Sequence, residues 1–407
     1  MKITLRLLMP VRSSFAPSAA ATVAAASLFF SGLALAQPAR PPGETFRVVT
    51  VVEGLVHPWS MAFLPNGDML VTEKPGRLRI VRQGKLLPDP VPGLPEIRIS
   101  AREGLQDVML HPDFESNRMI YLSYAKSNET GSLGTTALSR ARFEDDRLVD
   151  LEEIFVADAW ADADGHYASR IAFDREGYLF LSVGDRRAGL RADGSLDPDL
   201  QGHPAQDNSN HQGTIVRLHD DGRVPADNPF VGVEGARPEI WSFGHRNQQG
   251  LAVHPQTGQL WATEHGPQGG DELNHIRPGR NYGWPIIGYG ANYVTGTEIH
   301  GTRTHQDMEQ PAAFWVPSIA PSGLAVYQGD QFPNWQGNLF AGGLSEDHGR
   351  LSRVSLNGST VIDRKPLLMS EYRIRDVREG PDGFLYLALD DFAGGMSEII
   401  RLEPTDE

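Results

Sequence analysis

The sequence predicts an all-β protein folded as a six-bladed β-propeller. The main observation is a unit that recurs six times: a short apolar strand, a turn rich in Pro, Asp, Asn or Gly, and a second apolar strand. Turn-forming residues are also abundant, with 43 glycines and 29 prolines in 407 residues, and no collagen-like period accounts for them. No segment has the periodicity of a long amphipathic helix, which argues against a two-domain α/β protein.

Each copy of the repeated unit is a predicted β-hairpin. In the first copy, Trp59–Phe63 and Met69–Val71 flank the turn Pro65-Asn66-Gly67. Asn-Gly and Asp-Gly between apolar runs are strong hairpin signals, because these residues tolerate positive φ. The paired strands of the other five copies are 108–110 and 120–122, 171–173 and 178–181, 251–253 and 260–262, 324–326 and 338–340, and 376–377 and 384–387.

Most copies are followed by a third predicted strand in which polar and apolar residues alternate. Alternation is typical of strands, since successive side chains face opposite sides of a sheet. Examples are 77–81, 137–141, 214–218, 351–354 and 398–402. Irregular spacings of roughly 45–80 residues favour propeller blades with loop insertions over a solenoid. Either Phe46–Val52 or Glu398–Leu402 would complete a blade shared by the two ends of the chain.

The N-terminus has the features of a secretory signal peptide. A positively charged start precedes an apolar stretch that ends in Ala34-Leu35-Ala36, a typical cleavage pattern. We therefore expect residues 1–36 to be removed on export, 37–45 to form a Pro-rich lead-in, and 46–403 to form the propeller. The predicted location is secreted and periplasmic. No later segment approaches the roughly 18–20 apolar residues of a membrane span.

Composition narrows the classes of partner. The formal net charge is −15, and without a Lys/Arg cluster in the mature chain we expect no nucleic-acid binding. The chain has no cysteine, which excludes disulfides, thiolate nucleophiles and Cys-based metal sites. A monomer and a homodimer are both compatible with the sequence.

Four stretches are longer than plain turns require, at 98–107, 158–170, 185–213 and 262–310. Loops on one face of a propeller carry its ligand. The strongest candidate region is 241–251, which gathers Arg246, Asn247 and Gln249 beside a strand. Such a set suits a planar ligand rich in carbonyl and carboxylate groups, because Arg offers a rigid donor fork and amides pair donors with acceptors. The alternative is a polar loop that caps a blade.

A second region, 264–274, combines carboxylates with carbonyl groups exposed by glycines. Calcium takes oxygen ligands in flexible geometry, so this composition suits Ca²⁺. On spacing alone, an acidic surface turn is the favoured alternative. No EF-hand spacing is present.

Three motifs together resemble those of the soluble quinoprotein glucose and sorbosone dehydrogenases, specifically the aldose sugar dehydrogenase branch. They are Gly-His-Arg-Asn-x-Gln-Gly at 244–250, Glu-x-Gly-Pro-x-x-x-Asp-Glu at 264–272, and Asn-Tyr-Gly-Trp-Pro at 281–285. The resemblance covers about residues 46–403. It implies a six-bladed propeller that binds pyrroloquinoline quinone (PQQ) and Ca²⁺. The implied reaction is oxidation of the anomeric hydroxyl of an aldose to a lactone, with an electron acceptor that the sequence does not identify.

The resemblance also implies catalytic roles. His166 matches the family's general base, and an unperturbed pKa of about 6.5 lets histidine accept a proton near neutral pH. The hydride of the sugar then passes to PQQ, and Arg246 stabilises the negative oxygen that forms there, as in an oxyanion hole. Asp185 matches a carboxylate that orients His166.

Other residues are implied to hold the cofactor and the metal. Asn247 and Gln249 would fix the cofactor and the substrate edge. Arg373 and Arg375 alternate along a strand and can share one face, where paired guanidinium groups suit the PQQ carboxylates; solvated strand charges are the alternative. Carbonyl groups of Gly266 and Pro267 would hold calcium. Glu272 and Tyr282 fall where relatives hold a second, structural calcium.

Three positions depart from the family pattern. Arg102 takes the place of a glutamine that relatives carry before a Gly-Leu-Leu run, and it is a candidate contact to the cofactor. Ser345 takes the place of a cofactor-binding lysine. Trp315 is an offset candidate for an aromatic residue that stacks near the cofactor. Two other functions therefore stay open: a Ca²⁺-dependent sugar lactonase, and a non-catalytic propeller that binds a ligand.

Overall fold

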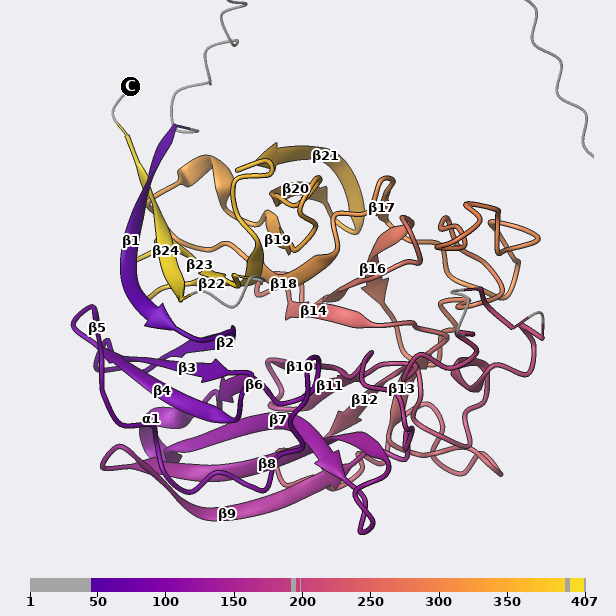
Figure 1. The fold of residues 1–407 in the computed structure, drawn as a ribbon, viewed down its shortest axis with the longest axis horizontal. Helices are drawn as coiled ribbons and strands as arrows, with labels where there is room; N and C mark the ends of the chain where they lie inside the picture. Colours follow the sequence, from indigo (N-terminus) through magenta and orange to yellow (C-terminus); the bar gives the residue numbers. More distant parts are fainter. Residues whose placement is uncertain (1–44, 192–194, 198, 392–395, 406–407) are drawn as a thin grey trace, which may run out of the picture. The chain divides into compact units, whose positions relative to one another are not determined.

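Six four-stranded antiparallel sheets form the blades of this chain in a computed structural model, which confirms the predicted all-β propeller (Figure 1). The structure describes residues 45–191, 195–197, 199–391 and 396–405, all within one compact unit, Pro41–Glu407. The predicted signal peptide 1–36, and the lead-in 37–45 apart from Thr45, lie outside the described residues. In the described part, no helix is long and apolar enough to cross a membrane.

Five blades consist of four strands that follow one another along the chain. The first comprises β2 (Pro58–Phe63), β3 (Met69–Glu73), β4 (Arg77–Arg82) and β5 (Lys85–Leu86). The second comprises β6 (Leu105–Leu110), β7 (Met119–Ser127), β8 (Gly134–Glu144) and β9 (Arg147–Val156). The third comprises β10 (Ala168–Phe173), β11 (Leu179–Val183), β12 (Thr214–Leu218) and β13 (Ile240–Phe243). The fourth comprises β14 (Gln248–Val253), β15 (Leu260–Glu264), β16 (Asp271–Ile276) and β17 (Ala313–Trp315). The fifth comprises β18 (Pro321–Val326), β19 (Leu339–Gly343), β20 (Leu351–Asn357) and β21 (Thr360–Leu367).

The sixth blade joins the two ends of the chain. It contains β22 (Ile374–Glu379), β23 (Leu385–Leu389) and β24 (Ser397–Pro404), and β1 (Phe46–Leu55) is its fourth strand. Both segments that could complete a shared blade therefore do so, because β1 pairs with β24 in antiparallel register. Arg47 and Glu403 reinforce this pairing with an ion pair of 2.7 Å between residues 356 positions apart.

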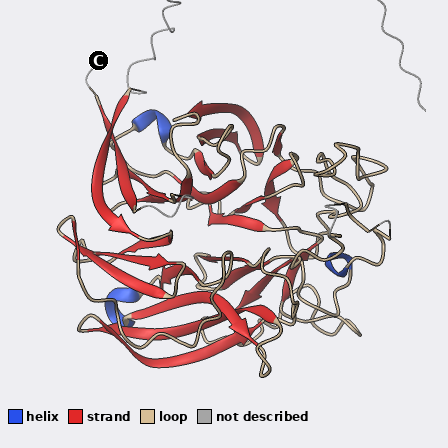
Figure 2. Cartoon of the chain, in the orientation of Figure 1, coloured by secondary structure: helices blue, strands red, loops and turns tan. Residues whose placement is uncertain are grey.

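Helices are rare, as Figure 2 shows. The described residues contain the single turn α1 (Phe114–Asn117) and two short 3₁₀ turns, Pro204–Gln206 and Pro333–Trp335. All six predicted hairpins are present. The alternative interpretation of 264–274 as an acidic surface turn is wrong. Asp271 begins β16, which pairs with β15 and β17, and its side chain is fully buried.

The first strands of the six blades touch in sequence around the ring: β2, β6, β10, β14, β18, β22 and again β2. Apolar clusters fill the spaces between neighbouring blades, for example Trp261, Leu273, Leu324 and Leu339 between the fourth and fifth. Residues of the inner strands, among them Trp59 on β2, Gln249 on β14 and Arg375 on β22, line the cavity described next.

Candidate active site

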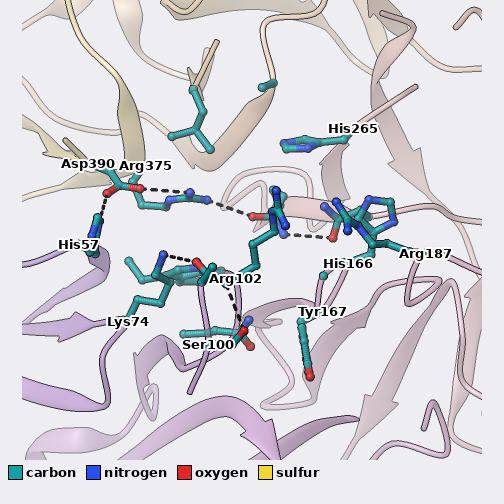
Figure 3. A pocket seen from close by; sticks show the side chains of 18 of the residues that line it. His57, Lys74, Ser100, Arg102, His166, Tyr167, Arg187, His265, Arg375 and Asp390 are labelled. Atoms are coloured by element: carbon teal, nitrogen blue, oxygen red, sulfur yellow. Dashed lines mark hydrogen bonds and ion pairs between the residues drawn. The ribbon is translucent and has the colours of Figure 1, made fainter. Parts of the chain in front are cut away.

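A cavity of about 620 Å³ opens where the inner ends of several blades meet (Figure 3). Its described lining includes six cationic side chains and one carboxylate, Asp390. The six are Lys74, Arg102, Arg187, Arg246, Arg373 and Arg375. An excess of one sign in a concave, partly desolvated site focuses the field and favours a ligand of the opposite charge.

His166 lies on the cavity wall just before β10, in a stretch of left-handed backbone. The φ angles are 54° at His166, 58° at Ala168 and 72° at Ser169. Its Nδ1 lies 2.6 Å from Asp185 Oδ1. Because a carboxylate accepts, Nδ1 carries the proton, and Nε2 keeps its lone pair.

Burial lowers the pKa of His166 to about 4, and the charges of Arg246 and Arg187 act in the same direction, whereas Asp185 opposes them. The imidazole is therefore neutral at pH 7. A neutral imidazole that is already hydrogen-bonded to a carboxylate can accept a proton at Nε2 and hold it as an imidazolium.

Asp185 lies behind His166 and is almost completely buried. It accepts hydrogen bonds from Trp284 Nε1 at 2.8 Å and from the backbone N–H of Arg187 at 2.9 Å. Burial would raise the pKa of Asp185, but His166 and Arg246 hold it below its ordinary value. The Asp185 carboxylate is thus ionised and fixed in orientation, although it does not itself line the cavity.

Arg246 reaches into the cavity from the loop between β13 and β14. Its Nη1 donates to the carbonyl groups of His265 at 3.1 Å and Gly266 at 3.3 Å, and its Nη2 donates to Tyr293 Oη at 3.1 Å. The Arg246 backbone N–H donates to Glu264 at 2.8 Å. These contacts fix a cationic donor on the same cavity as His166.

Asn247 and Gln249 connect the His166 side of the cavity to the opposite wall. Asn247 Oδ1 accepts from the backbone N–H of Ala168 and from Gln249 Nε2, both at 3.2 Å. Gln249 Oε1 accepts from Arg375 Nη1 at 3.3 Å. The structure therefore brings these two predicted residues together with Arg375 in one hydrogen-bonded row.

The far wall of the cavity carries the predicted arginine pair. Arg373 precedes β22 and donates to the carbonyl of Leu344, and Arg375 lies on β22, 3.3 Å from Asp390. Both side chains line the cavity, as the expected shared face requires. Arg102 also lines it and pairs with Asp164 at 3.1 Å.

The predicted calcium residues surround a separate, small cavity of about 20 Å³ beside Arg246. Gly266, Pro267, Glu272 and Tyr282 all line it, together with Glu264. Carbonyl oxygens converge there: a Cβ on Gly266 would meet those of Gly269 at 2.3 Å and Gly270 at 2.4 Å. Asp271 fixes the backbone here by accepting a hydrogen bond from the Gly266 N–H at 3.0 Å.

Oxygen donors of this kind fit a hard cation. Burial and the neighbouring Glu264 raise the pKa of Glu272, the response of a carboxyl group held beside a second carboxylate. Among the described residues, no group of three or more His, Asp or Glu side chains is arranged for a metal. The described oxygen donors for a cation here are thus the carboxylates of Glu264 and Glu272 together with backbone carbonyl groups.

Two positions compared with cofactor contacts on the basis of the sequence, Trp315 and Ser345, are not part of the described lining of the main cavity. Trp315 lies on β17 opposite Asp271, and this register turns its side chain into the core between the fourth and fifth blades, with Arg364 5.7 Å from its ring. Its predicted contact with a cofactor is thus corrected. Ser345 also lies outside the described lining, which includes its neighbour Leu344.

Several lining residues were missed from the sequence. They are His57, Lys74, His265, Tyr293 and Asp390. Lys74 stands in a Lys-Pro-Gly turn and Tyr293 in a long insertion, where sequence alone gives no sign that the side chain faces a cavity. Trp284 belongs to a motif that was noticed, but its contact with Asp185 needs the fold.

A sequence profile of the "Glucose / Sorbosone dehydrogenase" family matches residues 55–401. This chain belongs to that family. It is 40% identical over 371 residues to the aldose sugar dehydrogenase YliI of Escherichia coli, covering 88% of this chain and 93% of the relative.

Solved structures agree with the family assignment. The family member described here superposes on the apo-form of the soluble aldose sugar dehydrogenase from Escherichia coli with a TM-score of 0.80 and 38% identity, covering 89% of this chain and all of that one. Against the PQQ-bound aldose sugar dehydrogenase from Streptomyces coelicolor the TM-score is 0.70 at 27% identity, with 89% of this chain and 99% of that one covered.

Proposed function

We propose that this family member is a quinoprotein oxidoreductase that oxidises the anomeric hydroxyl of aldoses to lactones with PQQ. The observation that carries the proposal is the neutral His166, paired with Asp185, facing the same cationic cavity as Arg246. This combination places a base and a fixed cation around one ligand space. The sugar and an electron acceptor are the proposed partners.

The cavity fits PQQ, which is a planar quinone with three carboxylates. Arg373 and Arg375 supply guanidinium groups for carboxylates, while Asn247 and Gln249 supply amides for the edge of the ring system. When bound, PQQ supplies the quinone that accepts two electrons from the sugar. Binding of PQQ by a structural relative supports this choice.

His166 Nε2 would take the proton of the anomeric hydroxyl while the hydride of the same carbon leaves for the cofactor. Asp185 stabilises the imidazolium that results, because its carboxylate already holds Nδ1. The guanidinium of Arg246 stabilises negative charge that develops at the reacting end of the cavity. Its bonds to two carbonyl groups and Tyr293 keep it in place.

Calcium is part of the same proposal. The carbonyl groups of Gly266 and Pro267 would hold one ion, and Glu272 and Tyr282, with Glu264, would hold a structural ion. Bound calcium supplies a Lewis acid beside the site. We further propose that the protein works in the periplasm after removal of residues 1–36, as a monomer or a homodimer.

The lactonase and the non-catalytic alternatives find less support. A lactonase with carboxylates around its metal needs a carboxylate cluster in the main cavity, whose described lining has Asp390 alone. A mere binding propeller has no need of the His166–Asp185 pair.

Reconstitution tests the proposed function. The purified protein, loaded with PQQ and Ca²⁺, is expected to reduce a dye in the presence of aldoses, and His166→Gln should lower kcat by about 10²- to 10⁴-fold. PQQ affinity should stay within a few fold of the wild type, because His166 is assigned to proton transfer. His348→Gln, at an exposed histidine outside the cavity, is the control. No dye reduction across a panel of aldoses would overturn the proposal.

A further inference from the structure

Lys74 is a cavity residue that neither the sequence motifs nor the proposed mechanism uses. It follows β3, in the turn that leads to β4, and its side chain points into the main cavity (Figure 3). Its Nζ donates to the carbonyl of Ala101 at 2.6 Å, which leaves two of the three ammonium protons for other partners.

The backbone of Lys74 is held firmly from both sides. Its N–H donates to the carbonyl of His57 at 3.0 Å, and its own carbonyl accepts from the N–H of Leu105 at 3.2 Å. Gly104 packs so closely that a Cβ there would lie 1.9 Å from the Lys74 carbonyl oxygen. The ammonium is therefore presented from a fixed base, which reduces the entropy lost when it binds a ligand.

Three arginines and one carboxylate surround this ammonium. Burial lowers the pKa of Lys74; Asp390 opposes the shift, and Arg375, Arg373 and Arg102 add to it. Asp390 is already engaged, because His57 Nδ1 lies 2.7 Å from one of its oxygens and Arg375 lies 3.3 Å from the other. The described lining thus has more cations than its single carboxylate can balance.

We propose that Lys74 binds a carboxylate of the ligand, beside Arg373 and Arg375 of the neighbouring sixth blade. The β3–β4 turn of the first blade and β22 of the sixth blade are neighbours, so their cations would together bind the carboxylates of a flat ligand. Lys74 lies on the first blade and provides an ammonium beside the two guanidinium groups of the sixth. This inference rests on the proposed function for the identity of the ligand, PQQ.

Binding measurements with three compounds test the role of Lys74. Quenching of tryptophan fluorescence gives Kd for PQQ, for its trimethyl ester, which keeps the quinone but lacks the charges, and for benzene-1,3,5-tricarboxylate, which is inert to redox chemistry. Lys74→Met is expected to weaken binding of both tricarboxylates about 10- to 100-fold, the usual effect of losing a hydrogen bond to a charged group. Binding of the ester should change less than threefold.

Two matched variants separate charge from structure. Lys74→Arg should restore most of the affinity, and Lys85→Met removes the same charge from an exposed site on β5 and should change nothing. The wild type should also lose more affinity with rising salt than Lys74→Met does, since one charge contact is absent in the variant. A merely structural role of the Ala101 contact would weaken the ester and the acids equally, and that result would overturn the inference.

The outcomes distinguish this inference from the proposed function. If the wild type binds PQQ and oxidises sugars while Lys74→Met binds PQQ equally well, the role of Lys74 is overturned and the function stands. If the wild type binds only the inert tricarboxylate and Lys74→Met loses it, the function is overturned and the anion-binding role stands. Binding of neither tricarboxylate by the wild type overturns both.

Discussion

His166 and Asp185 are in contact, yet at neutral pH the imidazole is uncharged and the carboxylate is ionised. Burial disfavours the charged form of both groups. The imidazole therefore stays neutral, whereas the carboxylate stays ionised because it accepts three hydrogen bonds. Titratable pairs whose surroundings separate their pKa values in this way are typical of acid–base sites. Two predictions follow from the pKa of His166.

The first prediction concerns the pH dependence of the reaction. The base must be unprotonated to act, and its pKa of about 4 lies below the ordinary 6.5. Activity at saturating cofactor should therefore be retained down to about pH 5 and fall through an acid limb near pH 4. Profiles of kcat/KM from pH 3.5 to 8 measure this limb. An acid limb near pH 6.5 would contradict the lowered pKa of the buried His166 imidazole.

The second prediction concerns Asp185→Asn. Asp185 raises the pKa of His166, so its removal should move the acid limb to still lower pH. The plateau of kcat should fall by about 10²- to 10⁴-fold, because the imidazolium loses its carboxylate partner. Asp363→Asn, at an exposed carboxylate on β21, is the control. An unchanged plateau would remove Asp185 from the mechanism.

At the scale of elements, the sequence predicts the inner hairpins of the blades better than the outer strands. Strands such as β11 and β23 are buried along their whole length and read as apolar runs between turns, which the sequence shows directly. Outer strands such as β21 are mostly exposed and carry no regular pattern. They were missed, because a polar edge strand looks like a loop without its partner.

Sequence reasoning about the site failed for the same reason, since register is a property of pairs of strands. Trp315 precedes a Pro-containing loop and was expected at the cofactor, but pairing with Asp271 directs it into the core. By contrast, Arg246, Asn247 and Gln249 were found, because their motif is contiguous and specific. Lys74, His57 and Asp390 line the same cavity but come from three segments of the chain, and only the fold joins them.

A third prediction concerns the strand that closes the ring. Leu55 lies on β1, is fully buried and packs with Met61, Val71 and Ile399. Leu55→Ala should lower the free energy of unfolding by about 2–5 kcal/mol, because it leaves a cavity at the closure. Ile362→Ala, at a side chain that is 63% exposed on β21, should change it by about 0.5 kcal/mol or less. Urea denaturation measures both, and equal effects would show that this closure contributes little.

At the scale of the whole molecule, a buried ion network lies beneath the cavity and connects several blades. Arg170 on β10 lies 2.8 Å from Asp376 on β22 and 3.6 Å from Asp107 on β6. Its guanidinium also donates to the backbone carbonyl groups of Gln249 and Arg375. The network thereby links strands that carry the binding residues.

A fourth prediction concerns this network. Arg170→Met should lower the free energy of unfolding by about 3–5 kcal/mol, because it leaves the two buried carboxylates of Asp107 and Asp376 with Arg378 as their one remaining cation in this network. The affinity for PQQ should fall as well, since Gln249 and Arg375 lose their backbone support. Arg191→Met, in a pair whose side chains are both half-exposed, should cost less than about 1 kcal/mol. An equal loss of unfolding free energy in the two variants would show that the Arg170 network does not hold the blades together.

The closure of the sixth blade has a consequence for how the chain matures. His57, which lies between β1 and β2, reaches Asp390, 333 positions later. The His57 side of the cavity can therefore form only once the sixth blade is present, and contacts so distant in sequence form slowly. A chain cut short before β22 retains His166 and Arg246 but lacks Arg375 and Asp390, which line the cavity. Ligand binding therefore depends on the sixth blade as well as on the blades that carry His166 and Arg246.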